Sequence, residues 1–159
     1  MTAVTLDRPS HDEDLHAWAF DHAERLRALA RTRPNEPIDW EHLAEELEDM
    51  GRRERRGAEA YLKLVILHLL KLEYAHDTTS ARHWRAEIAA FRKNLARLLT
   101  PSLRTLLPGE LADIYELARA EALATTGGDP GFDDRAPDAC PYSWEQIIGD
   151  WLPERADPC

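Results

Sequence analysis

The sequence predicts an all-α protein, a single-domain bundle of about five to seven helices with a long acidic loop before a short C-terminal helix. Three observations support this fold class. Apolar residues recur at spacings of three and four along most of the chain, and no segment alternates as a strand would. Proline and glycine gather in a few short segments between these stretches. The chain has 159 residues, of which 43% are hydrophobic, enough to bury one core without a metal or a disulfide.

The first helix is expected to begin at a capping box formed by Ser10 and Glu13 and to run to about residue 31. One face of this stretch is apolar, and two prolines in TRPNEP then end the helix. The apolar face also carries His22. Its members are Leu15, Trp18, Ala19, His22, Leu26 and Leu29.

The segment 38–75 is the centre of the predicted fold. Asp39 is a plausible N-cap for an acidic amphipathic stretch, whose apolar positions are spaced by three and four residues up to Met50. Gly51 either ends this helix or bends it, so that 39–75 is one bent helix or two. The part from about residue 52 to residue 75 is the most apolar of the chain, and His68 lies in the middle of its apolar face.

The second half of the chain predicts further helices and one long loop. A basic amphipathic helix follows residue 80, and Pro101 ends it and starts a short turn. Another helix is expected from Pro108 to the TTGG segment, and residues 127–139 read as a loop rich in Gly, Pro and Asp. A second capping box, Ser143 with Gln146, predicts a short helix that includes Trp151. The core is expected at about residues 11–152, with flexible ends at 1–9 and 154–159.

The charge of the chain is polarised. The net charge of −10 divides into −6 for residues 1–79, +5 for 80–107 and −9 for 108–159. Either the basic and acidic segments lie against each other within the fold, or the basic segment is a surface for an anionic partner. The net charge argues against general nucleic-acid binding, because attraction to phosphates needs an excess of Lys and Arg. Cytoplasmic location is expected, since no apolar run is long enough for a membrane span and the N-terminus lacks an export signal. The cysteines, Cys140 and Cys159, are expected to be free thiols.

Four blocks of the sequence resemble a known family. They are DEDLHAW, DWEHLAEELEDMGRRERR, LHLLK followed by HWR, and CPYSWEQI. In this order and at these separations they are similar to the bacterial domain-of-unknown-function family 29, over about residues 11–155. The resemblance implies a compact, all-helical cytoplasmic domain of no established activity. It does not include His22. The matching positions are Trp18, Leu43, Glu45, Glu46, Met50, Gly51, His68, Lys71, Trp84, Arg85, Pro141, Trp144 and Glu145.

His68 and His22 are the candidate metal ligands, because both lie on apolar helix faces and Glu46 or Glu45 could supply a third ligand from a facing helix. The alternative is that His68 is a neutral imidazole held in the core by one hydrogen bond. The tryptophans, including Trp84, are expected to pack in the core. Arg85 could pair with Glu45 or Glu46, and Lys71 could extend from the core edge.

The preferred functional hypothesis is a non-enzymatic protein-interaction or regulatory module, with a protein partner or self-association through the acidic 39–50 helix. It rests on the strong charge division and on the absence of any nucleophile, phosphate loop or other catalytic signature. No cofactor is expected. One alternative is a helical-bundle metalloprotein that uses His68 with Glu45 or Glu46 and could act as a hydrolase. A weaker alternative is binding of an anionic ligand by Arg52, Arg55, Arg56, Arg85, Arg92 and Lys93.

Overall fold

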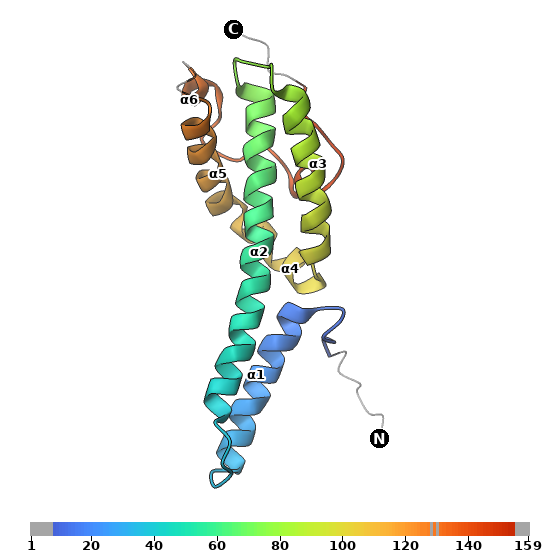
Figure 1. Cartoon of the computed structure of the whole chain (residues 1–159), viewed down its shortest axis with the longest axis vertical. Helices are drawn as coiled ribbons and strands as arrows, with labels where there is room; N and C mark the ends of the chain where they lie inside the picture. The colour runs from blue at the N-terminus through green and yellow to red at the C-terminus, as the bar shows by residue number, and fades with distance from the viewer. Residues whose placement is uncertain (1–7, 128, 130, 155–159) are drawn as a thin grey trace. The chain divides into compact units, whose positions relative to one another are not determined.

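The structure, a computed structural model, describes residues 8–127, 129 and 131–154. Within these residues the chain is helical without strands, which confirms the all-α class (Figure 1). Most of the two ends expected to be flexible, 1–9 and 154–159, lies outside the described residues. The elements are α1 (Leu15–Thr32), α2 (Trp40–Tyr74), α3 (Ala81–Leu98), α4 (Pro101–Leu106), the 3-10 helix η1 (Leu107–Glu110), α5 (Leu111–Thr125), α6 (Phe132–Arg135) and α7 (Trp144–Ile148).

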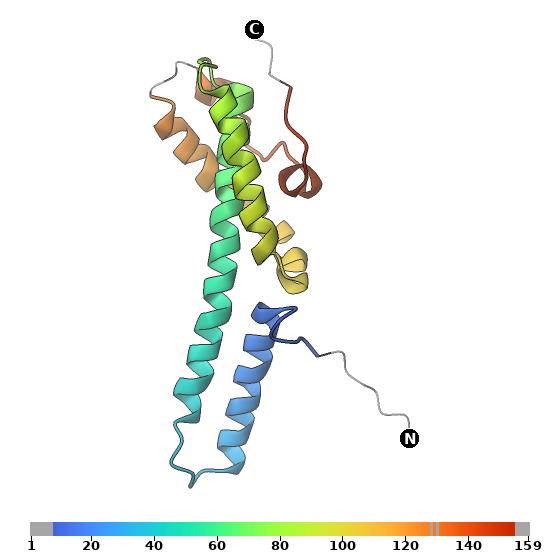
Figure 2. The ribbon, with the colours of Figure 1, turned by 45° about the vertical axis from the view of Figure 1, so that its right-hand side comes forward.

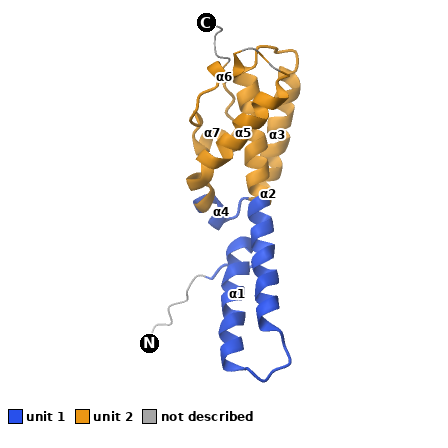
Figure 3. Cartoon of the chain, turned by 90° about the vertical axis from the view of Figure 1, so that its left-hand side faces the viewer, with its two compact units in different colours: residues 1–56, 99–105 blue, residues 57–98, 106–159 orange. Residues whose placement is uncertain are grey.

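The chain forms two compact units, coloured separately in Figure 3. Unit 1 comprises residues 1–56 and 99–105, and unit 2 comprises residues 57–98 and 106–159. The long helix α2 contributes its N-terminal half to unit 1 and its C-terminal half to unit 2. The sequence predicted one domain, and the structure distinguishes two units that share one helix.

Unit 1 is built on a hairpin in which α1 runs beside the N-terminal half of α2 (Figures 1 and 2). The first helix begins at Leu15, later than expected, because Asp14 is the N-cap and accepts from Ala17 N at 3.0 Å. Ser10 and Glu13 form a turn before it, in which Ser10 Oγ accepts from Glu13 N.

The Asp14 carboxylate also links α1 to α4 within unit 1 through hydrogen bonds. It accepts from Ser102 N at 2.7 Å and from Ser102 Oγ at 2.7 Å. Burial would raise the pKa of Asp14, but these hydrogen bonds and the one from Ala17 outweigh burial and hold the pKa below its ordinary 3.8. Burial also lowers the pKa of the neighbouring His16, whose Nδ1 lies 3.1 Å from Ser102 Oγ.

The helix α2 passes through Gly51 without a break, so 39–75 contains one helix of 35 residues. Asp39 is its N-cap as expected, since Asp39 Oδ1 accepts from His42 N at 3.2 Å. Gly51 lies within this helix, and α1 packs against it at close range. A Cβ added at Gly51 would lie 2.7 Å from Phe20 Cε2 and 3.4 Å from Ala19 Cβ. Glycine here permits close packing of two helices and does not terminate one.

Unit 2 surrounds the C-terminal half of α2, with α3 on one side and α5 on the other (Figures 1 and 2). Six successive residues of α2, from Val65 to Leu70, are buried. Residues 65–70 of α2 are therefore enclosed on all sides, where the sequence predicted one apolar arc. The largest fully buried side chains contributed by the other helices are Ile88, Leu95, Leu107, Tyr115, Phe132 and Ile147.

The predicted loop 127–139 contains a short helix, α6, which corrects the expectation that this segment is irregular. Gly131 precedes it with φ 82°, and the fully buried Phe132 anchors it in the core of unit 2. Arg135 Nε donates to Tyr74 O at 2.9 Å and holds α6 against the end of α2. A single apolar side chain without periodic neighbours gave no helical signal in the sequence.

The boundaries of the last helices also differ in part from the prediction. The expected capping box of Ser143 and Gln146 is present at the start of α7. This helix ends at Ile148, so Trp151 lies beyond it. The stretch after Pro108 starts as the 3-10 helix and continues as α5 from Leu111. Among the described residues no helix combines the length and hydropathy that crossing a membrane requires.

Candidate functional site

His68 is buried in unit 2, with 8% of its surface exposed, and both its ring nitrogens contact acceptors. Nδ1 lies 2.8 Å from Leu64 O on the preceding turn of α2. Nε2 lies 2.7 Å from Glu87 Oε2 on α3. The Phe91 ring packs beside the imidazole, with 5.3 Å between ring centroids. His68 is therefore in the core as expected, but with two polar partners in place of one.

The two contacts place a polar atom beside each ring nitrogen of His68. A carbonyl oxygen only accepts, so the Nδ1–H of His68 donates to Leu64 O. The contact between Nε2 and Glu87 Oε2 is a second polar contact, where the sequence predicted a core imidazole held by one hydrogen bond.

The Glu87 carboxylate also contacts a second histidine, His83. His83 Nε2 lies 3.3 Å from the same Glu87 Oε2, one helical turn away on α3. The side chain of His83 is 69% exposed and that of Glu87 31% exposed, so the cluster extends from the core to the surface of unit 2. Lys71 lies near it on α2, where burial lowers the pKa of its ammonium group and the Glu87 and Glu121 carboxylates act in the opposite direction.

The predicted metal ligands are divided between the two units. His68 lies in unit 2, whereas Glu45, Glu46 and His22 lie in unit 1. Glu45 and Glu46 are exposed. In unit 1, His22 Nδ1 lies 3.0 Å from Trp18 O and the His22 ring stacks on Trp18 at 4.4 Å. Within the part of the chain that is described, no three His, Cys, Asp or Glu side chains are grouped to hold a metal ion.

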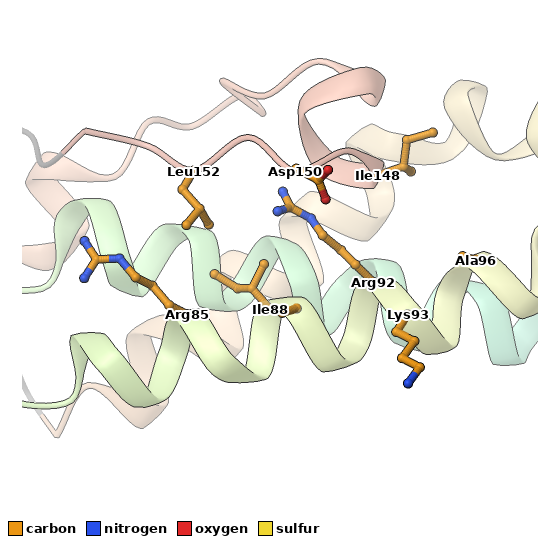
Figure 4. Close-up of a pocket in the computed structure, with 9 residues that line it drawn as sticks. Arg85, Ile88, Arg92, Lys93, Ala96, Ile148, Asp150 and Leu152 are labelled. Atoms are coloured by element: carbon orange, nitrogen blue, oxygen red, sulfur yellow. The ribbon is translucent and has the colours of Figure 1, made fainter.

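Three of the predicted anion-binding residues line one cleft in unit 2, between α3 and the segment that follows α7 (Figure 4). The cleft has a volume of about 370 Å³ and is bordered by Arg85, Arg92 and Lys93 together with the apolar Ile88 and others. In Figure 4, Arg92 points towards Asp150, whereas Lys93 points away. The remaining predicted cations, Arg52, Arg55 and Arg56, belong to unit 1.

Arg92 binds the C-terminal segment through hydrogen bonds to its backbone carbonyls. Its guanidinium donates to Ile147 O at 2.8 Å, to Gln146 O at 2.7 Å and to Trp151 O at 2.8 Å. Burial lowers the pKa of Arg92, and the Asp150 carboxylate acts against this. These carbonyls lie at and beyond the end of α7, where a cation is favoured. Arg92 therefore has a structural role, and the side chains of the cleft do not converge on one anion.

The acidic partners that the sequence suggested for Arg85 belong to a different unit. Arg85 is exposed on α3 in unit 2, and Glu45 and Glu46 are exposed on α2 in unit 1. Trp84 is half-buried and lines a second cleft of unit 2 with Ala75 and Ser80. It contributes to packing at the α2–α3 connection and not to the centre of the core.

The hairpin of unit 1 buries few large side chains. Its fully buried apolar residues within α1 and the first half of α2 are three alanines, Ala19, Ala23 and Ala44. Large apolar side chains remain exposed on it, with Leu29 at 38%, Ile38 at 43% and Leu43 at 47%. The hairpin thus combines an alanine-rich buried face with large apolar side chains on its surface.

An ion network joins the two helices of this hairpin. Arg27 on α1 donates to Glu48 and, at 2.8 Å, to Glu41 Oε1, both on α2. Arg52 donates to Glu48 Oε2 at 2.9 Å and to Asp49 Oδ1 at 2.8 Å. The hydrogen bond from Arg27 is the main cause that lowers the pKa of the Glu48 carboxyl. The acidic half of α2 is therefore partly neutralised on the side that faces α1.

Glu87 and His83 are the polar residues that the sequence reasoning did not select. One signal was available, because Glu87 is the single acid among six basic residues in the segment 80–107. Its spacing of four from His83 was a second signal. Neither identifies His68 as the partner, because that contact joins two helices.

Comparisons with known proteins agree with this fold. The model of the family described as "Domain of unknown function DUF29" matches residues 11–152. An alpha-helical protein of unknown function from Rhodospirillum rubrum, known from its crystal structure, superposes with a TM-score of 0.73. It is 25% identical in sequence, and the alignment covers 89% of this chain and 90% of that one. A comparison with curated proteins finds no match.

Proposed function

Since the chain belongs to the DUF29 family, whose description names no activity, we propose a function from its surfaces: it is a protein-interaction module that binds through the α1–α2 hairpin of unit 1. The observation that carries this proposal is the packing of that hairpin. Its two helices bury alanines against each other and leave Leu29, Ile38 and Leu43 exposed.

Two packed helices bury only one stripe of each, and stable helical domains add a further layer to cover the remaining apolar surface. Unit 2 has such a layer, since α3 and α5 cover its half of α2. The hairpin half of α2 has α1 alongside it. A protein partner that covers these side chains would bury the 38–47% of each that is still exposed, at a gain of about 0.6–1.4 kcal/mol each.

The polar clusters support binding in preference to catalysis. The His68–Glu87 pair joins α2 to α3 and is mostly buried, and Arg92 is committed to backbone carbonyls. Neither presents a nucleophile beside a base. The lowered pKa of Lys71 in unit 2 is explained by burial of its ammonium group.

The test compares the intact chain with an Ile38→Ser/Leu43→Ser variant. Both would be measured for molar mass by light scattering over a range of concentrations, and both would be used to capture proteins from a bacterial lysate. Self-association or a captured protein that is lost in the variant is expected. Leu117→Ser is the matched control, because Leu117 is 63% exposed but lies on α5 in unit 2. An intact chain that stays monomeric and captures nothing would remove the proposal.

A further inference from the structure

The exposed side of α2 in unit 1 carries a charged stripe of four residues, Glu46, Asp49, Arg53 and Arg56. Their spacings of three, four and three place them on one face of the helix, as at the a and d positions of a heptad. This face points away from α1, because the buried Ala44 and Gly51 lie on the opposite side. The stripe is acidic at its N-terminal end and basic at its C-terminal end.

The charges of the stripe are poorly satisfied within the chain. Among the described residues, Glu46, Arg53 and Arg56 have no ion-pair partner. Asp49 contacts Arg52 of its own helix at 2.8 Å. The stripe thus presents two carboxylates followed by two guanidinium groups to whatever lies beside it.

The order of these charges is self-complementary. Suppose that a second copy of α2 binds antiparallel, with the two-fold axis at the level of Gly51. A residue a given number of positions before Gly51 in one copy then faces the residue the same number of positions after Gly51 in the other copy. Glu46 and Arg56 lie five residues, or about 7.5 Å, on either side, and Asp49 and Arg53 lie two residues on either side. Glu46 then meets the Arg56 of the second copy, and Asp49 meets its Arg53.

We propose that this stripe is a homodimer interface, in which a second copy of the chain binds antiparallel and pairs Glu46 with Arg56 and Asp49 with Arg53. The inference rests on the proposed function and identifies its partner. A parallel arrangement is disfavoured because it would set acid against acid and base against base. The two-fold axis repeats each pair, so four ion pairs form from two kinds of contact.

Apolar side chains flank the stripe on one side. Leu43 is 47% exposed and Met50 is half-buried, and they are seven residues apart on the same edge of the helix. In the antiparallel arrangement, Met50 lies one residue from the axis and contacts the second copy's Met50. The flank supplies apolar burial, while the ion pairs set the direction and register of the two helices.

The experiment uses two double variants of the full chain, studied by sedimentation at low salt. Glu46→Arg/Asp49→Arg makes all four positions of the stripe positive, and Arg53→Glu/Arg56→Glu makes all four negative. Each variant alone is expected to be monomeric. Mixed together, they are expected to form a 1:1 heterodimer, because every pair is then of opposite charge. The wild-type dimer is expected to dissociate as salt rises, because exposed pairs are screened.

A matched control separates this inference from the proposed function. Asp113→Arg/Glu116→Arg makes the same change of charge at the same spacing on exposed positions of α5, and it is expected to leave the dimer intact. A wild-type chain that is monomeric at low salt overturns the inference, and so do double variants that remain dimeric alone or fail to bind each other. If the wild type dimerises regardless of the stripe, the proposed function stands and another surface carries it.

Discussion

Gly51→Ala is expected to change the stability of the protein in two opposite ways, through helix propensity and through packing. In a helix interior alanine is favoured over glycine by about 0.8–1 kcal/mol. The new Cβ would lie 2.7 Å from Phe20 Cε2 and 3.1 Å from Phe20 Cδ2. Carbon atoms in contact are normally about 3.5–4.0 Å apart, so the ring or the helix must move by about 1 Å. Overpacking of this kind costs about 1–3 kcal/mol, which leaves a net loss of about 0–2 kcal/mol.

The same substitution in a Phe20→Ala background isolates the contact. Without the ring, only the propensity gain remains, and Gly51→Ala is expected to raise the free energy of unfolding by about 0.8–1 kcal/mol. The two substitutions are therefore coupled by about 1–3 kcal/mol. Urea unfolding of the four proteins, followed by far-ultraviolet circular dichroism and by tryptophan fluorescence, measures this coupling.

Gly57→Ala is the matched control in the same helix. Its Cβ would meet only Leu98 Cδ1, at 3.2 Å, which is the end of a flexible side chain. We expect little loss or a small gain in stability. If Gly51→Ala changes the unfolding free energy equally with and without the Phe20 ring, the close approach of α1 is not the reason for glycine at this position.

Substitutions at three further positions test individual contacts. Asp14→Ala removes an N-cap and should lower the unfolding free energy by about 1–2 kcal/mol at neutral pH. Because the folded-state pKa of Asp14 is held below its ordinary 3.8, this stabilisation is present above that pH and lost as pH falls through the folded pKa, so a pH-independent difference in urea midpoints would contradict it. Glu87→Leu leaves His68 Nε2 without a partner and should cost about 1–3 kcal/mol, whereas Glu87→Gln retains a hydrogen bond and should cost less; equal urea midpoints for the two variants would refute this. Arg92→Leu deletes hydrogen bonds to three carbonyls, each worth about 1.5–3 kcal/mol, so limited proteolysis should cut the C-terminal segment at least about tenfold faster, and an unchanged rate would count against this role.

The principal helices could be predicted from the sequence because their signals are local. Amphipathic spacing identified the helices that became α1, α2, α3 and α5, and capping chemistry located the starts of two helices at Asp39 and Ser143. The burial of His68 followed from its place among leucines on α2. Each of these features depends on residues within a few turns of one helix.

Tertiary contacts decided what the spacing left open. Gly51 lies inside one helix at the point where Phe20 and Ala19 of α1 pack against it, and α6 places Phe132 in the core of unit 2. His68 pairs with Glu87, a residue on another helix that no spacing connects to it. The sequence by itself determined which segments are helical and which faces are apolar, since those follow from local periodicity. Which polar groups meet was decided by the packing of helices that are distant in the chain.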